Sequence, residues 1–189
     1  MVQIYYADSA GLSEAVLERW LARIDPAKAE RICRMRPDDA KASMTGELLL
    51  RYGAWQLFGI SPTSLQTAED SLGKPQVISH QGVHFSISHT GTLCLCAVGD
   101  VAVGADIQRV VPVRHHRLAE RYFTPAELAA YRGAGETEDA FFTLWAKKEA
   151  FGKLTGLGLR PAGDKAALPY NVELETEFQN CKVCVLSGT

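Results

Sequence analysis

The chain has 189 residues, 47 % of them hydrophobic, with a formal net charge of −2 and a pI near 6.2. This length and composition allow one domain or two small, tightly joined lobes with a proper core, and they exclude a disordered chain. The near-neutral charge gives no global reason to expect nucleic acid or an anionic membrane as partner, so any anion must be held by local clusters.

The chain shows no apolar run of membrane-spanning length, and its N-terminus lacks the charged start and long apolar stretch of a signal peptide. We therefore expect a cytoplasmic, monomeric protein without a membrane partner. The five cysteines are an odd number and suit reduced thiols. Cys181 and Cys184 form a lone C-x-x-C, which we interpret, like Cys94 and Cys96, as small apolar side chains rather than metal ligands.

The first half of the chain predicts a strand, three helices and then a run of short strands. Leu17, Trp20, Leu21 and Ile24 are predicted to point inward from the first helix. Asp25 and Pro26 give the next helix a capping residue and a proline at its first position. The expected strands are 2–7, 65–68, 84–88, 92–98 and 102–108, and the expected helices are 12–24, one from Asp25 and 38–58, closed by Gly59.

The second half predicts helices followed by two strands. A basic helix covers about 115–123, and Thr124 to Glu127 forms a capping box for the next helix. The last predicted helix runs from about 138 to 154 and stops at Gly156, before strands near 170–175 and 182–186. Long helices that end in Leu-x-Gly occur in both halves, which hints at an internal duplication.

Two segments about forty residues apart give the strongest chemical signal. In the predicted strand from 103 to 108, Asp106 and Gln108 point to the same face. In the predicted helix from 145 to 153, Glu149 lies on the same stripe as Trp145, and a carboxylate on an apolar stripe needs a partner. Two carboxylates and an amide oxygen flanked by lysines would form a hard-oxygen site suited to Mg²⁺. From the residues alone, an ordinary surface ion pair between Glu149 and Lys153 stays open.

Four blocks of the chain together resemble a known family. They are P-A-K-A-E-R near Lys28, L-G-K-P at 72–75, F-S-I-S-H-T-G at 85–91, and the strand and helix just described. In this order and spacing they resemble phosphopantetheinyl transferases of the surfactin-synthetase type. The resemblance implies an α+β fold of two lobes related by a pseudo-twofold axis, each a long helix packed on a small, mostly antiparallel sheet. The implied lobes are 1–102, on the coenzyme A 3′-phosphate and adenine side, and 103–189, with the metal motifs and the active site between the two.

The resemblance also implies the reaction, which moves the 4′-phosphopantetheine arm of coenzyme A to a serine of an acyl or peptidyl carrier protein. Mg²⁺ would be held by Asp106 and Glu149, and the other product would be adenosine 3′,5′-bisphosphate. Gln108 stands where many relatives have glutamate, so weaker Mg²⁺ affinity is expected. Glu149, or a water that it orients, is the candidate base, and Lys148 and Lys153 are expected at the pyrophosphate.

The coenzyme A ligands also follow from the resemblance. Ser88 and His89, expected in a turn after their strand, would bind phosphate. A hydrolase pair is disfavoured, because neighbours in a strand point to opposite faces and no G-x-S-x-G surrounds the serine. Lys28 and Arg31 share a helix face and would clamp the 3′-phosphate, although a solvated basic face is the alternative.

Three further positions carry expectations or departures from the family pattern. Lys74 and Pro75 would lie beside the adenine, although the sequence alone predicts only a turn there. Ala42 stands where the family usually has an arginine, and Lys41 is a candidate replacement. Glu127 matches a recurring family acid, but helix capping explains it sufficiently.

Two other functions and one surface stay open. A Mg²⁺-dependent phosphodiesterase would need acidic ligands near lysines, but it would also need a basic groove, which the charge disfavours. A catalytically weak module that binds coenzyme A or a carrier protein is the other alternative, with Gln108 and Ala42 as its only signs. The densest basic cluster could dock an acidic carrier or be a solvated helix face; it contains Arg114, His115, His116, Arg117 and Arg121.

Overall fold

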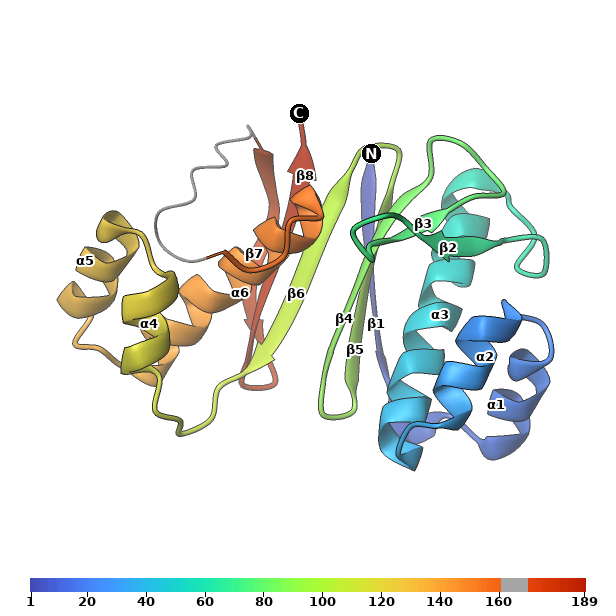
Figure 1. Cartoon of the computed structure of the whole chain (residues 1–189), viewed down its shortest axis with the longest axis horizontal. Coiled ribbons are helices and arrows are strands. Elements are labelled where there is room, and N and C mark those ends of the chain that lie inside the picture. Colours follow the sequence, from blue (N-terminus) through green and yellow to red (C-terminus); the bar gives the residue numbers. More distant parts are fainter. Residues whose placement is uncertain (161–169) are drawn as a thin grey trace.

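The computed structural model describes residues 1–160 and 170–189, and its elements divide into two lobes (Figure 1). The N-terminal lobe contains β1 (Val2–Asp8), a short 3₁₀ turn (Ser9–Gly11), α1 (Glu14–Leu21), α2 (Pro26–Cys33), α3 (Pro37–Phe58), β2 (Thr67–Glu69), β3 (Pro75–Val77), β4 (His84–Thr90) and β5 (Leu93–Gly99). The C-terminal lobe contains β6 (Val103–Arg109), α4 (His116–Tyr122), α5 (Pro125–Gly133), α6 (Glu138–Thr155), β7 (Tyr170–Phe178) and β8 (Cys181–Gly188).

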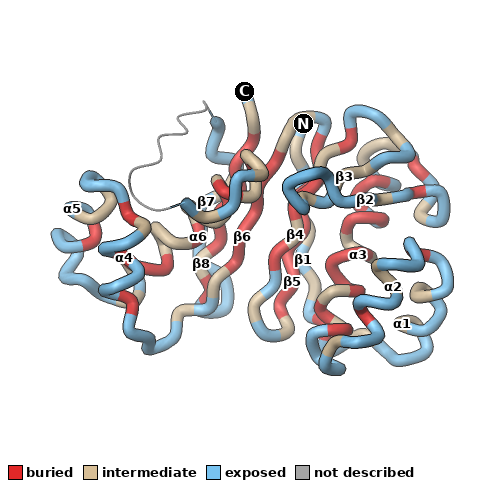
Figure 2. Tube along the Cα trace, viewed as in Figure 1, coloured by how far each residue is buried: buried red, intermediate tan, exposed pale blue. Residues whose placement is uncertain are grey.

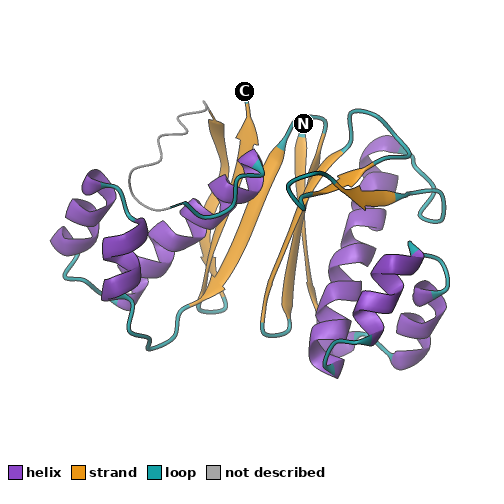
Figure 3. Cartoon of the chain, in the orientation of Figure 1, coloured by secondary structure: helices purple, strands orange, loops and turns teal. Residues whose placement is uncertain are grey.

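The lobes form four layers, with helices outside and two sheets facing each other in the middle (Figure 3). One sheet has the order β1-β5-β4 and the other β6-β8-β7, and every pairing within them is antiparallel. The long helix α3 packs on the first sheet and α6 packs on the second. The predicted two-lobed α+β class is therefore confirmed.

The main hydrophobic core lies between the two sheets. Alternate side chains of β5 face the second sheet, whereas Cys96 and Val98 on the other side of β5 pack against α3. All of β5 is consequently buried (Figure 2). The core between the sheets contains Leu93, Leu95, Ala97, Val103, Ala105, Ile107, Cys181, Val183 and Val185. Strand β7, at the outer edge of the second sheet, is by contrast mostly exposed.

Helix ends follow the predicted signals. The Asp25 side chain accepts a hydrogen bond from the Lys28 amide and begins α2. Gly59 (φ 68°) and Gly156 (φ 73°) end α3 and α6 in the left-handed conformation that glycine adopts at least cost. The inward face predicted for the first helix is confirmed, because Ile24 is buried and Leu17 packs beside it.

Several elements differ from the sequence prediction, among them α1, β4 and β3. Helix α1 begins at Glu14 rather than at residue 12, because Ser13 caps it. Strand β4 continues to Thr90, so Ser88 and His89 lie within a strand and not in the expected turn. The sequence also missed β3, which begins at Pro75 and pairs with β2 in a two-stranded hairpin.

Side chains, not backbone carbonyls, join the two sheets where their edge strands β4 and β6 meet. Backbone N–H groups of every second residue of β6 donate to hydroxyl oxygens of β4, and we call these contacts the hydroxyl ladder. Its three hydrogen bonds are Ala105 to Ser86 (2.9 Å), Ile107 to Ser88 (3.3 Å) and Arg109 to Thr90 (3.3 Å). The ladder satisfies polar groups that an edge strand would otherwise leave open.

Gly104 allows β6 to lie directly against α6. A Cβ atom at this position would lie 2.0 Å from the Ala150 carbonyl oxygen and 2.4 Å from the Leu154 nitrogen. Both obstacles are helix backbone, which cannot move aside as a flexible side chain can. The close approach of strand and helix therefore depends on glycine.

Within the described residues, α3 and α6 are the longest helices, and neither they nor any other described helix has the length and apolar character of a membrane span.

Candidate active site

Strand β6 and helix α6 bring the predicted acidic residues together at the junction of the lobes. Asp106 is only 2 % exposed, and its Oδ1 accepts hydrogen bonds from Ser88 Oγ and Lys153 Nζ, both at 2.7 Å. Its Oδ2 accepts a hydrogen bond from Gln108 Nε2 at 2.8 Å. The buried carboxylate thus has a partner from β4, from β6 and from α6.

Glu149 is the second carboxylate at this junction, and it is half-buried. Burial raises the pKa of Glu149, the negative charge of Asp106 raises it further, and Lys153 partly opposes both. A carboxyl group with a raised pKa beside a second acid is an arrangement that can bind a cation or accept a proton.

Lys153 contacts both lobes with one ammonium group. Besides Asp106, its Nζ donates to the Ala105 carbonyl oxygen of β6 at 3.1 Å and to the Ile87 carbonyl oxygen of β4 at 3.4 Å. These carbonyls belong to the same two edge strands that the hydroxyl ladder joins. The lysine therefore connects the lobes at the same place where it holds the acid.

A cavity of about 280 Å³ opens beside these residues, and we call it the inter-lobe cavity. Its lining includes Lys74, Pro75, Ser86, Ile87, Glu149 and Lys153. Lys74 donates from Nζ to the Leu154 carbonyl oxygen at 2.9 Å, and burial lowers its pKa. The turn before β3 thus reaches across to the end of α6 and closes one side of the cavity.

A second cavity of about 330 Å³ lies within the N-terminal lobe, and we call it the N-lobe cavity. Its lining includes Asp25, Lys28, Arg31, Thr67, Glu69 and Pro75. Pro75 lines both cavities, so they adjoin on either side of it. The structure therefore places the predicted residues Lys28, Arg31, Lys74 and Pro75 along two adjoining cavities.

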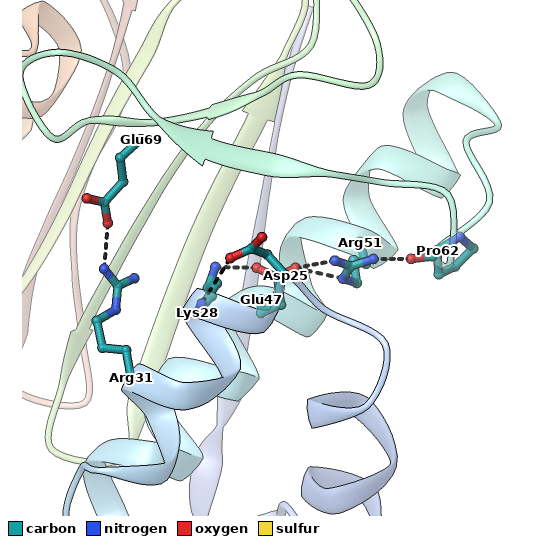
Figure 4. A network of polar contacts seen from close by, with 7 residues as sticks. All are labelled: Asp25, Lys28, Arg31, Glu47, Arg51, Pro62 and Glu69. Atoms are coloured by element: carbon teal, nitrogen blue, oxygen red, sulfur yellow. Dashed lines mark hydrogen bonds and ion pairs between the residues drawn. The ribbon is translucent and has the colours of Figure 1, made fainter.

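The two cations of the N-lobe cavity are already paired with carboxylates of the chain (Figure 4). Lys28 contacts Glu47, a residue of α3 that is fully buried, and Arg31 contacts Glu69 at the end of β2. Arg51 holds Glu47 from the other side with Nε at 2.7 Å and also donates to the Pro62 carbonyl oxygen. Sequence reasoning missed Glu47, although its place on the buried stripe of α3 is the same signal that identified Glu149.

The structure gives surroundings that the sequence did not predict to three proposed coenzyme A ligands, Ser88, His89 and Lys148. The Ser88 hydroxyl donates to Asp106 and accepts from Ile107 in the hydroxyl ladder. His89, on the opposite face of β4, is exposed. Lys148 pairs with Glu127 at 3.0 Å. Glu127 therefore does more than cap α5, because the same carboxylate also positions this lysine. Their assignments as coenzyme A ligands stay predictions.

Two sequence interpretations concern residues away from the cavities. Ala42 is buried, its carbonyl oxygen accepts from Cys94 Sγ, and neither it nor Lys41 lines the N-lobe cavity. The cysteines are free and all but Cys33 are buried, as the apolar interpretation predicted. Burial raises the pKa of Cys94 to about 11 and that of Cys184 to about 12, so both stay protonated thiols at neutral pH.

The basic cluster near α4 needs a correction. His115 is not a surface residue, because it is buried, stacks on Phe141 and hydrogen-bonds through Nδ1 to the Tyr131 hydroxyl at 2.6 Å. It precedes α4 and packs among the aromatic side chains between α4, α5 and α6. The exposed basic residues that remain are Arg114, His116, Arg117 and Arg121.

Comparisons with known proteins cover both lobes. A family model described as 4′-phosphopantetheinyl transferase superfamily matches residues 102–182, and one described as 4′-phosphopantetheinyl transferase, N-terminal, matches residues 13–100. A 4′-phosphopantetheinyl transferase of Bacillus subtilis is 31 % identical over 151 residues, which is 78 % of this chain and 67 % of the relative. The 4′-phosphopantetheinyl transferase Sfp of Bacillus subtilis strain 168 is 30 % identical over the same shares.

A solved structure also resembles part of the chain. It is a holo-(acyl-carrier-protein) synthase from Bacillus anthracis in complex with CoA (3′,5′-ADP), and it superposes with a TM-score of 0.44 and 18 % identity. The superposition covers 51 % of this chain and 91 % of that one. The family models and the relatives from Bacillus subtilis decide the classification: this chain belongs to the 4′-phosphopantetheinyl transferase superfamily, in its two-domain Sfp type.

Proposed function

We propose that this protein transfers the 4′-phosphopantetheine arm of coenzyme A to a serine hydroxyl of an acyl or peptidyl carrier protein. One observation carries the proposal. Two cavities meet at Pro75. One is lined by the cations Lys28 and Arg31, and the other by Glu149 and two lysines, one of which holds the buried carboxylate of Asp106. An elongated ligand with a phosphate at one end and a pyrophosphate further along, such as coenzyme A, matches that order.

Coenzyme A would lie across both cavities. Its 3′-phosphate would contact Lys28 and Arg31, and its adenine would lie beside Lys74 and Pro75. Its pyrophosphate would reach Lys153 in the inter-lobe cavity, with Lys148 able to turn from Glu127 toward it. The N-terminal lobe, residues 1–102, would then hold the nucleotide end and the C-terminal lobe, residues 103–189, the reacting end.

The donor set at the lobe junction suits Mg²⁺. Asp106 and Glu149 supply two carboxylates, and Gln108, whose amide faces Asp106, can turn its oxygen toward the same place. Among residues 1–160 and 170–189, no cluster of three or more His, Cys, Asp or Glu side chains suits a metal ion. With three protein ligands, an octahedral Mg²⁺ would keep positions for phosphate and water. A bound Mg²⁺ would supply charge neutralisation for the pyrophosphate oxygens.

The side chains of this site can serve the bond changes of the reaction. The incoming serine loses its proton to Glu149, or to a water that Glu149 orients. Its oxygen bonds to the β-phosphorus while the bond from that phosphorus to the bridging oxygen breaks. Adenosine 3′,5′-bisphosphate leaves with the bonding electrons. Lys153 and Lys148 would compensate the negative charge that develops on the leaving group.

One assay tests this function. The protein is incubated with coenzyme A, Mg²⁺ and an apo carrier protein, and the carrier is weighed intact by mass spectrometry. A gain of one phosphopantetheine is expected, together with adenosine 3′,5′-bisphosphate. Binding without transfer would favour a coenzyme A or carrier-binding module, and cleavage of coenzyme A with an unmodified carrier would favour a phosphodiesterase.

The exposed basic residues of α4 are the proposed docking surface for the acidic carrier. Arg117 and Arg121 are exposed and Leu118 between them is 39 % exposed, so charge and apolar surface alternate there. Exchanging both arginines for glutamate should raise the carrier KM more than the coenzyme A KM, and the effect should shrink with added salt. Equal changes of the carrier KM and the coenzyme A KM would show that α4 is not part of the docking surface.

The site of action would be the cytoplasm. All five cysteines are free and suit a reducing compartment, in which both coenzyme A and newly made carrier proteins would be met.

A further inference from the structure

The two cations of the N-lobe cavity are neutralised in different ways. Lys28 and Glu47 form a pair with side chains that are 15 % and 0 % exposed, whereas the side chains of Arg31 and Glu69 are 54 % and 50 % exposed. The first pair is enclosed by the lobe and the second faces the solvent (Figure 4). A ligand phosphate that enters this cavity must therefore compete with two unlike carboxylates.

Glu47 does not compete strongly for Lys28, because it has a second cation. Arg51, which is 2 % exposed, contacts the same carboxylate and lies over the Trp20 ring. The three buried side chains therefore carry a net charge of one positive unit. When Lys28 turns some of its donors to a phosphate, Glu47 keeps Arg51 as its partner and is not left as an unpaired buried charge.

Glu69 has no comparable second partner among the ion pairs of the described residues, since Arg31 is the cation that contacts it there. It lines the N-lobe cavity together with Arg31, so its carboxylate stays close to any anion that Arg31 binds. An entering phosphate must first displace Glu69 from Arg31 and then accept a negative neighbour. Both effects act on the guanidinium that the proposed function assigns to the 3′-phosphate, and they therefore oppose binding of that group.

We propose that Glu69 is a specificity-determining residue that competes with the 3′-phosphate of coenzyme A for Arg31. It thereby lowers the preference of the enzyme for coenzyme A over dephospho-coenzyme A. This inference rests on the proposed function, because it takes the N-lobe cavity as the 3′-phosphate site. Removing the charge of Glu69 should tighten binding of ligands with a 3′-phosphate by roughly two- to fivefold, the range typical of exposed ion pairs.

The test compares two nucleotides that differ by the group in question. Adenosine 3′,5′-bisphosphate and adenosine 5′-monophosphate are titrated calorimetrically into the wild type, Glu69→Gln and Glu30→Gln. Glu30 is the matched control, because it forms an exposed pair with Arg34 on the same helix and does not line the cavity. The variant Glu30→Gln loses the same charge as Glu69→Gln and therefore reports any effect of net charge alone.

We expect Glu69→Gln to bind the bisphosphate two- to fivefold more tightly with the monophosphate unchanged, and Glu30→Gln to match the wild type. In an Arg31→Ala background, Glu69→Gln should lose most of its effect, because the competition acts through that guanidinium. Equal tightening of both nucleotides, or no tightening of the bisphosphate, would overturn the role of Glu69. Failure of the wild type to bind either nucleotide would instead contradict the proposed function.

Discussion

The two cavities balance their charges in opposite ways. In the N-lobe cavity two cations face two carboxylates one to one, and all partners belong to the same lobe. In the inter-lobe cavity, burial and the nearby charge of Asp106 raise the pKa of Glu149, and Lys153 holds Asp106 while contacting both lobes. In the first cavity each cation already has a carboxylate partner before a ligand arrives, whereas in the second Asp106 and Glu149 lie near each other and Lys153 is paired with Asp106.

This difference indicates which ligands each cavity favours. A cavity whose cations already hold carboxylates can exchange one anion for another, so a phosphate can replace a carboxylate there at modest cost. An acidic pair gains most from a cation, since repulsion between its members is relieved. The reacting end of the enzyme would therefore depend on a metal, and the nucleotide end would depend only on the exchange of anions.

The largest expected effect concerns the acidic pair. Asp106→Asn and Glu149→Gln should each lower transfer by roughly two orders of magnitude or more, because each removes a charged ligand from the proposed Mg²⁺ site. Binding of adenosine 3′,5′-bisphosphate at the N-lobe cavity should change little. Circular dichroism and turnover are measured together, with Glu175→Gln as a control that removes an exposed acid facing α6. Near-normal transfer by either variant at saturating Mg²⁺ would disprove the metal assignment.

The next effect concerns the cations of the N-lobe cavity. The double variant Lys28→Ala and Arg31→Ala should lower the preference for coenzyme A over dephospho-coenzyme A about tenfold, because charge-assisted hydrogen bonds to the 3′-phosphate are lost. Values of kcat/KM for both substrates on both proteins measure it. Lys28→Ala alone should also lower the free energy of unfolding, and Arg31→Ala alone should not, since only the first pair is buried. An unchanged preference would place the 3′-phosphate elsewhere.

A smaller effect concerns the junction that supports the inter-lobe cavity. Ser86→Ala leaves the Ala105 N–H without its hydrogen-bond acceptor at a buried position and should lower the free energy of unfolding by about 1–3 kcal/mol. Denaturant titration measures this change. Ser61→Ala provides a control, because Ser61 is exposed on a loop away from the ladder. Equal stability of Ser86→Ala and the wild type would show that the ladder contributes little to joining the lobes.

The smallest effect is a dependence of stability on pH. Glu149 has a raised pKa in the folded state. Its contribution to stability is fully present when the pH is below its ordinary pKa, near 4.5, and it is lost as the pH rises through the raised pKa. Glu149→Gln has no such group, so its melting temperature should rise relative to the wild type between pH 4 and 7. Mg²⁺ should reduce that difference at pH 7. A constant difference across this range would contradict the electrostatic link between Glu149 and Asp106.

Local sequence patterns predicted the catalytic end better than the nucleotide end. The period of two in β6 and the period of four in α6 put Asp106 and Glu149 on inward faces, so their meeting needed only that strand and helix pack together. The partners of Lys28 and Arg31 lie 19 and 38 residues further along the chain. Such contacts depend on how α2, α3 and the β2–β3 hairpin pack together. Local periodicity in the sequence does not predict this packing.

Two misinterpretations share a physical cause. The segment from Ser88 suggested a turn, but β4 continues to Thr90, and its hydroxyls at Ser86, Ser88 and Thr90 meet the open edge of β6. His115 suggested a basic surface, but its ring is flat and half apolar and stacks within the aromatic cluster. In both cases a polar side chain satisfied an internal need, and residue type alone does not distinguish this from ligand binding.

Gly104 bears on how mutational scans of this enzyme are interpreted. Any side chain there would push α6 away from β6, and with it Glu149 away from Asp106. Gly104→Ala should therefore lower activity as much as the loss of an acidic residue does, although Gly104 itself offers no side chain to a ligand. In a scan, the two classes can be separated by protein yield and melting temperature. A substitution at Gly104 should lower both, and Glu149→Gln should lower neither. In directed evolution, position 104 is a poor choice for randomisation, however close it lies to the chemistry.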